Sequence, residues 1–453
     1  MRDAIRASRA DYTEIRLERS WVTTVAQRGR RHEGATTGVD EGGCVRVLHR
    51  GHGWGLASFT SLEQLPAMVE RARELSLAVR LDEPIPWVPV PPREDDVLLD
   101  LDGDVRGIPL DEKRSYVDRL NAAMLEYDRR IVNTKVAYRD EVTEYWYGNS
   151  EGTLLYQQRP EFTISAHAVA RESGTEEQAL ASVGGRSGWN SARNEEDRFR
   201  AAAQCAIDLL AAPRVGDGRY PVVLDPRFAG VIAHEAIGHL SEADVILEDS
   251  QVAGMLPLGR KVGPDCLTIG DDGHVAGLRG TLPYDDEGTP TQRTLLIQHG
   301  VVVGRLHSRE TAARLAEAPT GNARALSYRH PPIVRMTNTF VEHGEGQLDD
   351  LLSGIDLGVY AVDVLLGRTH LDSFSYTAGY GRMIRDGQLA EMVKGVTMAG
   401  NLFDMLGAID RVSGDFTWTE SGGGCGKEGQ SPLPVAEGAP HVRVSSLSVG
   451  RPA

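Results

Sequence analysis

The chain has 453 residues, which allows two or three domains, each with its own hydrophobic core. Its net charge of −16 disfavours nucleic acid and anionic membrane surfaces as partners. The first residues lack the apolar segment of a signal peptide, and no apolar run approaches the roughly 18 residues of a membrane span. The four cysteines are too scattered for a disulfide framework, so we expect a cytoplasmic protein.

The N-terminal half alternates strand-like runs with single helices, and this order occurs twice. Strands are predicted at 13–18, 22–28, 44–49, 54–59, 131–138, 142–149, 153–158 and 162–172, and helices at 62–77, 111–127 and 195–212. A proline-rich connector at 84–92 is expected to be extended. We therefore predict an N-terminal α/β domain over 1–212, built from two related strand-rich units with packed helices.

The stretch 213–221, with its glycines and aspartate, predicts a domain boundary, and a mainly β domain is expected over 220–453. Hairpins are predicted at 295–306, around His299-Gly300, and at 383–393, around the type I′ pair Asp386-Gly387. Helices are expected at 308–318 and 397–407, and a last strand at 441–449. The predicted fold class is α+β, with a β-rich C-terminal domain that carries one functionally important helix.

That helix contains the segment His234-Glu235-Ala236-Ile237-Gly238-His239. In the zincin motif H-E-x-x-H, two imidazoles one helical turn apart share a zinc ion, and the glutamate takes a proton from metal-bound water. Here the histidines are five positions apart, which in a regular helix separates them by about 140°. A π-turn would bring them back to one face, and Gly238 favours such a distortion, so we predict either a π-bulge or an early helix end over 236–239. The alternative is two structural histidines beside a surface glutamate.

The residues before the motif favour a helix that begins at a buried strand. Residues 222–224 are apolar, Asp225 is a good N-cap, and Pro226 suits the first helical position. Phe228, Ile232 and Ala236 then recur four residues apart, as on a buried stripe.

A hydrolytic zinc site needs three protein ligands, and Cys425 is the best candidate for the third. It lies in a stretch with five glycines, residues 422–430, where the backbone can approach closely and Lys427 would favour the thiolate. Aspartate or glutamate ligands, or an incidental glycine loop, are alternatives.

Other polar residues have weaker roles in this interpretation. Glu242 and Asp244 could orient a ligating histidine or lie at a solvated helix end. Cys205, Cys44 and Cys266 are expected to be structural. The stretch 368–372, with Arg368, His370 and Asp372, could contact substrate or belong to a turn and strand.

HEAIGH followed by GGGCGKEGQ near the C-terminus resembles the TldD/PmbA family of metallopeptidases, on the side of its active, TldD-like subunit. The segments 321–340 and 393–406 are also similar to family segments, so the resemblance covers nearly the whole chain. It implies that His234, His239 and Cys425 bind Zn²⁺ and that Glu235 is the general base. It also implies a dimer around an enclosed cavity, commonly a heterodimer with an inactive TldE/PmbA-like paralogue.

The implied function is zinc-dependent hydrolysis of unfolded or small peptides, bound as an added β-strand. One alternative is a narrow-specificity maturation protease or amidase for a ribosomal peptide product. The other is a non-catalytic assembly subunit with a structural zinc, which predicts a closed site of four ligands.

Overall fold

The computed structural model describes residues 1–99, 101–419 and 421–450. In this described chain, the N-terminal part forms one seven-stranded sheet in the order β3-β2-β1-β5-β6, with β7 antiparallel and β4 parallel to β6. The strands are β1 Tyr12–Arg28, β2 Arg31–His49, β3 Gly53–Phe59, β4 Glu94–Val97, β5 Ile131–Asn149, β6 Leu154–Glu172 and β7 Thr175–Gly185.

The strands of this N-terminal sheet are longer than predicted, because polar residues that suggested breaks are paired inside the sheet. The two strands expected at 131–138 and 142–149 are one strand, β5, in which buried Asp140 forms an ion pair with Lys113 at 2.6 Å. The two strands expected at 13–18 and 22–28 are also one strand, β1, in which the Ser20 and Thr143 hydroxyls lie 2.6 Å apart. Antiparallel pairing of β1 with β5 places the two predicted strand–helix units side by side in one sheet.

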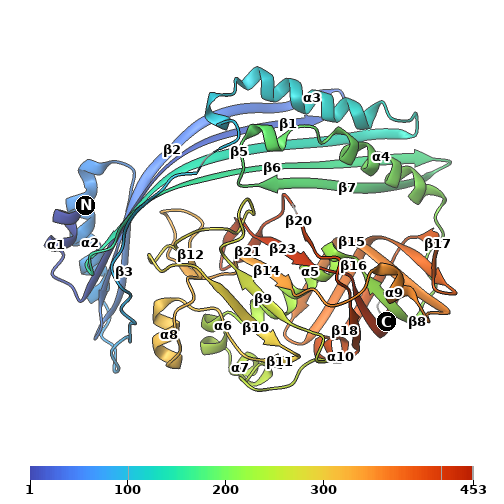
Figure 1. Ribbon diagram of the computed structural model, residues 1–453. Coiled ribbons are helices and arrows are strands. Elements are labelled where there is room, and N and C mark those ends of the chain that lie inside the picture. The colour runs from blue at the N-terminus through green and yellow to red at the C-terminus, as the bar shows by residue number, and fades with distance from the viewer. Residues whose placement is uncertain (100, 420, 451–453) are drawn as a thin grey trace.

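Helices cover the outer face of the N-terminal sheet, and the sheet curves over the rest of the molecule (Figure 1). Their bounds are α1 Arg2–Ala7, α2 Leu65–Leu77, α3 Leu110–Leu125 and α4 Glu196–Ala211. α3 and α4 bury an apolar stripe against β5 and β6, and α2 packs on β2 and β3. Within the described residues, no helix is both long and apolar enough to cross a bilayer.

The remaining chain forms a β-rich C-terminal body with two larger sheets, in the orders β11-β10-β9-β14-β23-β20 and β15-β8-β24-β18-β16-β17, and two small hairpins, β12-β13 and β21-β22. The first strands are β8 Gly218–Leu224, β9 Ile269–Asp272, β10 Arg293–Gln298, β11 Val301–Val302, β12 Ala323–Arg324, β13 Ile333–Val334, β14 Asn338–Val341, β15 Leu357–His370 and β16 Ser373–Arg385. The later strands are β17 Gln388–Val393, β18 Thr397–Asn401, β19 Ile409–Val412, β20 Thr417–Thr419, β21 Cys425–Lys427, β22 Gln430–Leu433, β23 Ala436–Ala439 and β24 Val442–Val449. The helices are α5 Pro226–Ile232, α6 Ala243–Glu248, α7 Ser250–Met255, α8 Arg309–Leu315, α9 Leu348–Leu352 and α10 Leu402–Gly407.

Both predicted hairpins of this body are confirmed. Asp386 and Gly387 have φ of 48° and 75°, the left-handed pair that a type I′ turn requires, and His299 and Gly300 have 48° and 72°. The helix predicted over 397–407 is wrong in its first half: residues 397–401 form β18, and Asn401 then caps α10 by accepting from the Phe403 N–H at 2.9 Å.

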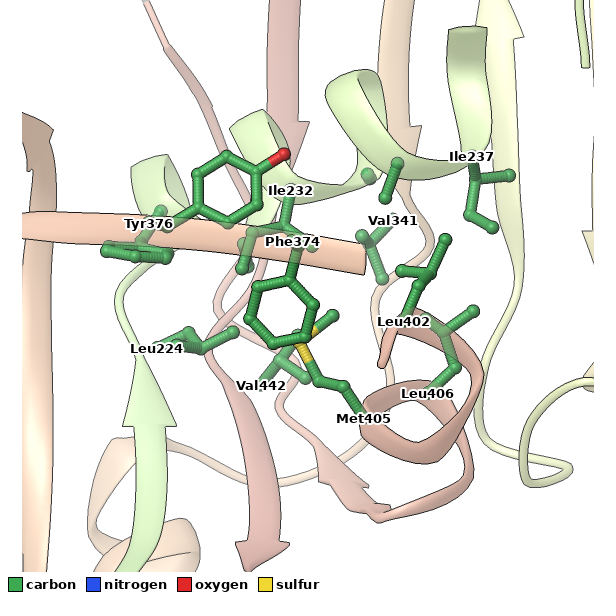
Figure 2. Packing of buried hydrophobic residues seen from close by; sticks show 14 of the residues in the cluster. Leu224, Ile232, Ile237, Val341, Phe374, Tyr376, Leu402, Met405, Leu406 and Val442 are labelled. Atoms are coloured by element: carbon green, nitrogen blue, oxygen red, sulfur yellow. The ribbon is translucent and has the colours of Figure 1, made fainter. Parts of the chain in front are cut away.

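The core of the C-terminal body lies between its two larger sheets, and α5 is packed within it. α5 contacts β14, β20 and β23 of one sheet and β15 of the other. Figure 2 shows Ile232 of α5 in one apolar cluster with Phe374 and Tyr376, together with Leu402 and Met405 of α10. The helix that bears the histidine motif is therefore anchored on apolar contacts from both sheets, which fixes its position.

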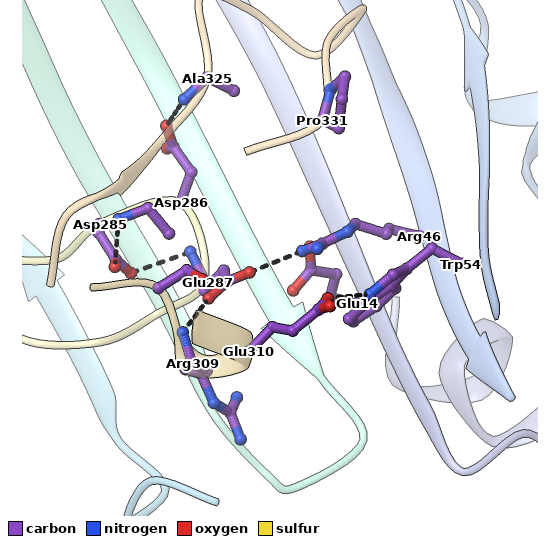
Figure 3. A network of polar contacts seen from close by, with 12 residues as sticks. Glu14, Arg46, Trp54, Asp285, Asp286, Glu287, Arg309, Glu310, Ala325 and Pro331 are labelled. Carbon is purple, nitrogen blue, oxygen red and sulfur yellow. Dashed lines mark hydrogen bonds and ion pairs between the residues drawn. The ribbon is translucent and has the colours of Figure 1, made fainter. Parts of the chain in front are cut away.

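A buried polar network joins the N-terminal sheet to the C-terminal body (Figure 3). Arg46 of β2 donates to Glu14 of β1 at 3.2 Å and to Glu287 of the body at 2.9 Å, and its guanidinium lies 3.7 Å from the Trp54 ring centre. Trp54 in turn donates to Glu310 at 2.7 Å. Because the buried carboxylates of Glu14 and Glu287 share the Arg46 cation, this junction favours one relative placement of the N-terminal sheet and the C-terminal body.

Candidate metal centre

The histidine motif begins where α5 changes to a π-turn. Asp225 caps α5 by accepting from the Phe228 N–H at 2.8 Å, as predicted. Residues Ala233–Gly238 are π-helical, and the His239 N–H donates to the His234 carbonyl, five residues back. The predicted π distortion is therefore confirmed, although it starts three residues earlier than expected. It places the two imidazoles side by side, with ring centres 5.3 Å apart.

Gly238 is needed for space rather than for an unusual backbone conformation. Its φ is not in the left-handed region, but a Cβ at this position would lie 2.0 Å from the sulfur of buried Met336. The glycine lets the π-turn approach the segment between β13 and β14.

Cys425 completes a compact donor set with the two histidines. One ligand atom from each of His234, His239 and Cys425 lies within 4.8 Å of the others, and this is the only such cluster among the described residues. The Cys425 sulfur is 3.2 Å from Nε2 of His239. Ligands of one tetrahedral zinc, at ~2.3 Å for sulfur and ~2.0 Å for nitrogen, lie roughly 3.5 Å apart, so the spacing fits a shared ion.

The three donors influence one another's protonation. Burial opposes ionisation of the Cys425 thiol, but hydrogen bonds from the two histidines outweigh it and lower its pKa to about 5. Burial also opposes charging of His239, but Cys425 and Glu242 raise its pKa to about 10. The histidines, rather than Lys427 as predicted, thus favour the thiolate, which is the form that binds metal.

Glu235 lies on the accessible side of the donor set. Its side chain is 39% exposed, whereas those of His234 and His239 are 2% and 25% exposed. Its Oε2 is 3.9 Å from Nε2 of His239. A carboxylate in this place can reach both the donor set and a molecule that enters from solvent.

Buried polar groups hold the outer nitrogen of each imidazole. Nδ1 of His239 lies 3.2 Å from the Glu242 carboxylate. Of the two predicted alternatives for Glu242, this contact favours orientation of a histidine over a solvated helix end. Nδ1 of His234 lies 3.4 Å from the Thr339 hydroxyl, which donates to Asp271 at 3.3 Å. Each Nε2 is thereby left for a metal ion.

Some of these groups could not be found from the sequence. Thr339 and Asp271 belong to β14 and β9, which pair only in the folded chain, and Glu437 of β23 places an oxygen 4.0 Å from Nδ1 of His234. No short motif connects them to the histidines. Asp244 contacts Lys427 at 2.6 Å instead of a histidine.

The remaining candidates lie outside the donor set, in different surroundings. Cys44 is buried in β2, Cys205 packs against the core under α4, and Cys266 is exposed. Arg368 and His370 are exposed near the end of β15, and the Asp372 carboxylate accepts from Asn401 at 2.8 Å. The substrate role considered for 368–372 stays a prediction.

Comparison with known proteins assigns most of the chain to one family. Models of the PmbA/TldA metallopeptidase domain 1, central domain and C-terminal domain match residues 13–76, 103–212 and 217–451. A metalloprotease of Synechocystis is 42% identical over 98% of this chain and 95% of its own length. A zinc metalloprotease TldD homolog of Saccharolobus solfataricus is 28% identical and covers 97% of each chain.

The fold is also found in solved structures. TldE from Thermococcus kodakarensis superimposes with a TM-score of 0.81 over 100% of both chains, at 19% sequence identity. A likeness at this identity concerns the fold alone. The family models and the Synechocystis relative show that this chain belongs to the TldD/PmbA family of metallopeptidases.

Proposed function

We propose that this protein is a zinc-dependent peptidase that hydrolyses unfolded or small peptides. His234, His239 and Cys425 would hold Zn²⁺, and Glu235 would act as general base. The observation that carries the proposal is the combination of three converging donors with a half-exposed glutamate beside them. Two imidazoles and a thiolate form a donor set that suits zinc.

When bound, the zinc ion would supply a Lewis acid that polarises the scissile carbonyl and lowers the pKa of the attacking water. Glu235 would accept the water proton at its carboxylate and pass it to the leaving amine. Thr339 and Glu242 would keep the two imidazoles oriented through their Nδ1 atoms. The peptide would bind as an added strand, which uses main-chain hydrogen bonds and needs little side-chain selectivity.

One observation weighs against a purely structural zinc. A structural site takes four protein ligands, and the cluster among the described residues has three, with Glu235 directed to the same place. A narrow-specificity maturation protease or amidase would use the same chemistry, and it differs only in predicting cleavage of one peptide product. We also propose a dimer, either of this chain or with a TldE/PmbA-like paralogue.

The test combines zinc content with cleavage of a disordered peptide for wild type, Glu235→Gln and Glu248→Gln. Glu248 is an exposed glutamate at the end of α6 and serves as the matched control. We expect near-stoichiometric zinc in all three proteins and loss of cleavage in Glu235→Gln alone, by at least about 10²-fold. Cleavage by Glu235→Gln would refute the general base, and wild type without zinc would refute the metal site. Each protein is assayed alone and with the candidate paralogue, and light scattering measures the assembly.

A further inference from the structure

Cys425 lies on a small two-stranded element. Its hairpin, β21 and β22, forms a two-stranded sheet apart from the two larger sheets of the body. Of its two strands, β22 is held by Arg335, which donates to the Gln430 carbonyl at 3.2 Å, and by the Gln430 amide, which donates to the Pro331 carbonyl at 3.0 Å. The strand that carries Cys425 is held on the side of the histidines by Lys427.

Lys427 makes three contacts with groups that surround the metal centre. Its ammonium group lies 3.1 Å from Glu242 and 2.6 Å from Asp244, and it donates to the Val334 carbonyl at 3.0 Å. The side chain is only 10% exposed, and Glu242 is fully buried. Such a pair is held firmly, because separating it would leave a charge without a partner in the interior.

The Glu242 carboxylate connects the two segments that supply the donors. A single oxygen, Oε2, lies 3.2 Å from Nδ1 of His239 and 3.1 Å from the Lys427 ammonium. The other oxygen is buried without a hydrogen-bond partner among the described residues. Glu242 follows His239 by three residues and Lys427 follows Cys425 by two, so this carboxylate fixes the thiol-bearing strand against the π-turn.

Asp244 and Val334 close the arrangement. The Asp244 carboxylate accepts from the Val334 N–H at 2.9 Å, while the Val334 carbonyl accepts from Lys427. Val334 ends β13, two residues before Met336, whose sulfur rests against Gly238 in the π-turn. The Cys425 strand is therefore located relative to the histidines along two routes, both of which start at Lys427.

We infer that Lys427 is a positioning residue for the metal centre: through Glu242 and Asp244 it sets the place of the Cys425 thiol relative to the two imidazoles. This inference rests on the proposed metal site and adds to it a residue outside the three proposed ligands. Outer groups of this kind typically change metal affinity by about 10- to 100-fold.

The experiment compares Lys427→Met with Lys113→Met. Lys113 is the matched control, because it is also a buried lysine, 2% exposed and 2.6 Å from Asp140, but it lies on α3, which covers the N-terminal sheet. Zinc affinity is measured by competition with a chelator, and Co²⁺ loading reports the thiolate-to-metal charge-transfer band. Thermal midpoints of the metal-free proteins separate positioning from general stability.

We expect Lys427→Met to lose about 10- to 100-fold in zinc affinity and to weaken the cobalt–thiolate band, while Lys113→Met keeps both. Lys427→Arg should retain part of the affinity, and Glu242→Gln should reproduce the loss if Lys427→Met does not fold. Wild-type affinity in folded Lys427→Met, or an equal loss in Lys113→Met at equal destabilisation, would overturn the inference. Wild type that binds no zinc would instead refute the proposed function.

Discussion

The contact between Gly238 and Met336 leads to a prediction in which two opposite effects compete. Replacing Gly238 with alanine favours a helical backbone by about 1 kcal/mol. The new Cβ, however, would lie 2.0 Å from the Met336 sulfur and 3.2 Å from its Cγ, while an ordinary contact is roughly 3.5 to 4.0 Å. The sulfur must therefore move by roughly 1.5 Å or more.

Met336 cannot move freely, because its side chain is fully buried in the apolar core that surrounds α5 and the π-turn. Methionine is flexible, but overpacking of a dense core costs typically 1–3 kcal/mol. We expect the steric cost to exceed the helical gain, so Gly238→Ala should be destabilised by up to ~2 kcal/mol.

Unfolding of the metal-free protein measures this effect, with Gly254→Ala as the control. Gly254 lies in α7, and a Cβ at this position would meet no neighbouring atom within 4 Å, so alanine there should stabilise by about 0.5 to 1 kcal/mol. A second check is the background Met336→Ala, in which Gly238→Ala should cost less, with a coupling of at least about 0.5 kcal/mol. If Gly238→Ala stabilises as much as Gly254→Ala does, the close contact does not constrain the π-turn.

Two further predictions concern charges. In the metal-free protein, the difference in thiolate absorbance between wild type and Cys425→Ser should titrate near pH 5, because the histidines lower the pKa of the Cys425 thiol. The thiolate then stabilises the fold fully above the ordinary thiol pKa, and this contribution is lost as the pH falls through about 5. A midpoint near the ordinary value of about 8.5 would contradict the donor geometry. Arg46→Met should lower the free energy of unfolding by about 3–5 kcal/mol, because Glu14 and Glu287 would remain buried without their shared cation. The control Arg19→Met removes an exposed ion pair and should lower it by at most ~1 kcal/mol. Equal thermal midpoints for the two variants would show that the junction does not depend on Arg46.

Local sequence patterns predicted which helices and strands form better than they predicted where each one begins and ends. The Asp386-Gly387 turn and the Asp225 cap were predictable, because each depends on residues adjacent in the sequence. The strand β7 was not predicted, since Thr175–Gly185 begins with acidic residues and is rich in alanine and glycine, which have low strand propensity. It forms because it pairs along its whole length with β6, and such pairing cannot be read from either segment alone.

The same limit applies to the metal centre. The spacing of His234 and His239 predicted the π-turn, because the requirement that both imidazoles face one ion is a local geometric condition. Cys425 was suggested by residue chemistry and by the family resemblance, but neither indicates its distance from the histidines. Thr339 and Asp271 had no signal, since their role arises from the pairing of β14 with β9.

The centre thus has two halves with different physical origins. One half, the π-turn, is set by the chain around Gly238 and by the apolar core that surrounds α5. The other half, the Cys425 strand, is placed by ion pairs of Lys427 with carboxylates near His239. Apolar packing holds the π-turn, and we expect the place of the thiol to depend in addition on the buried lysine. Removing Lys427 is therefore expected to lower metal affinity by more than its loss of stability explains, whereas a change at Gly238 should act chiefly on stability.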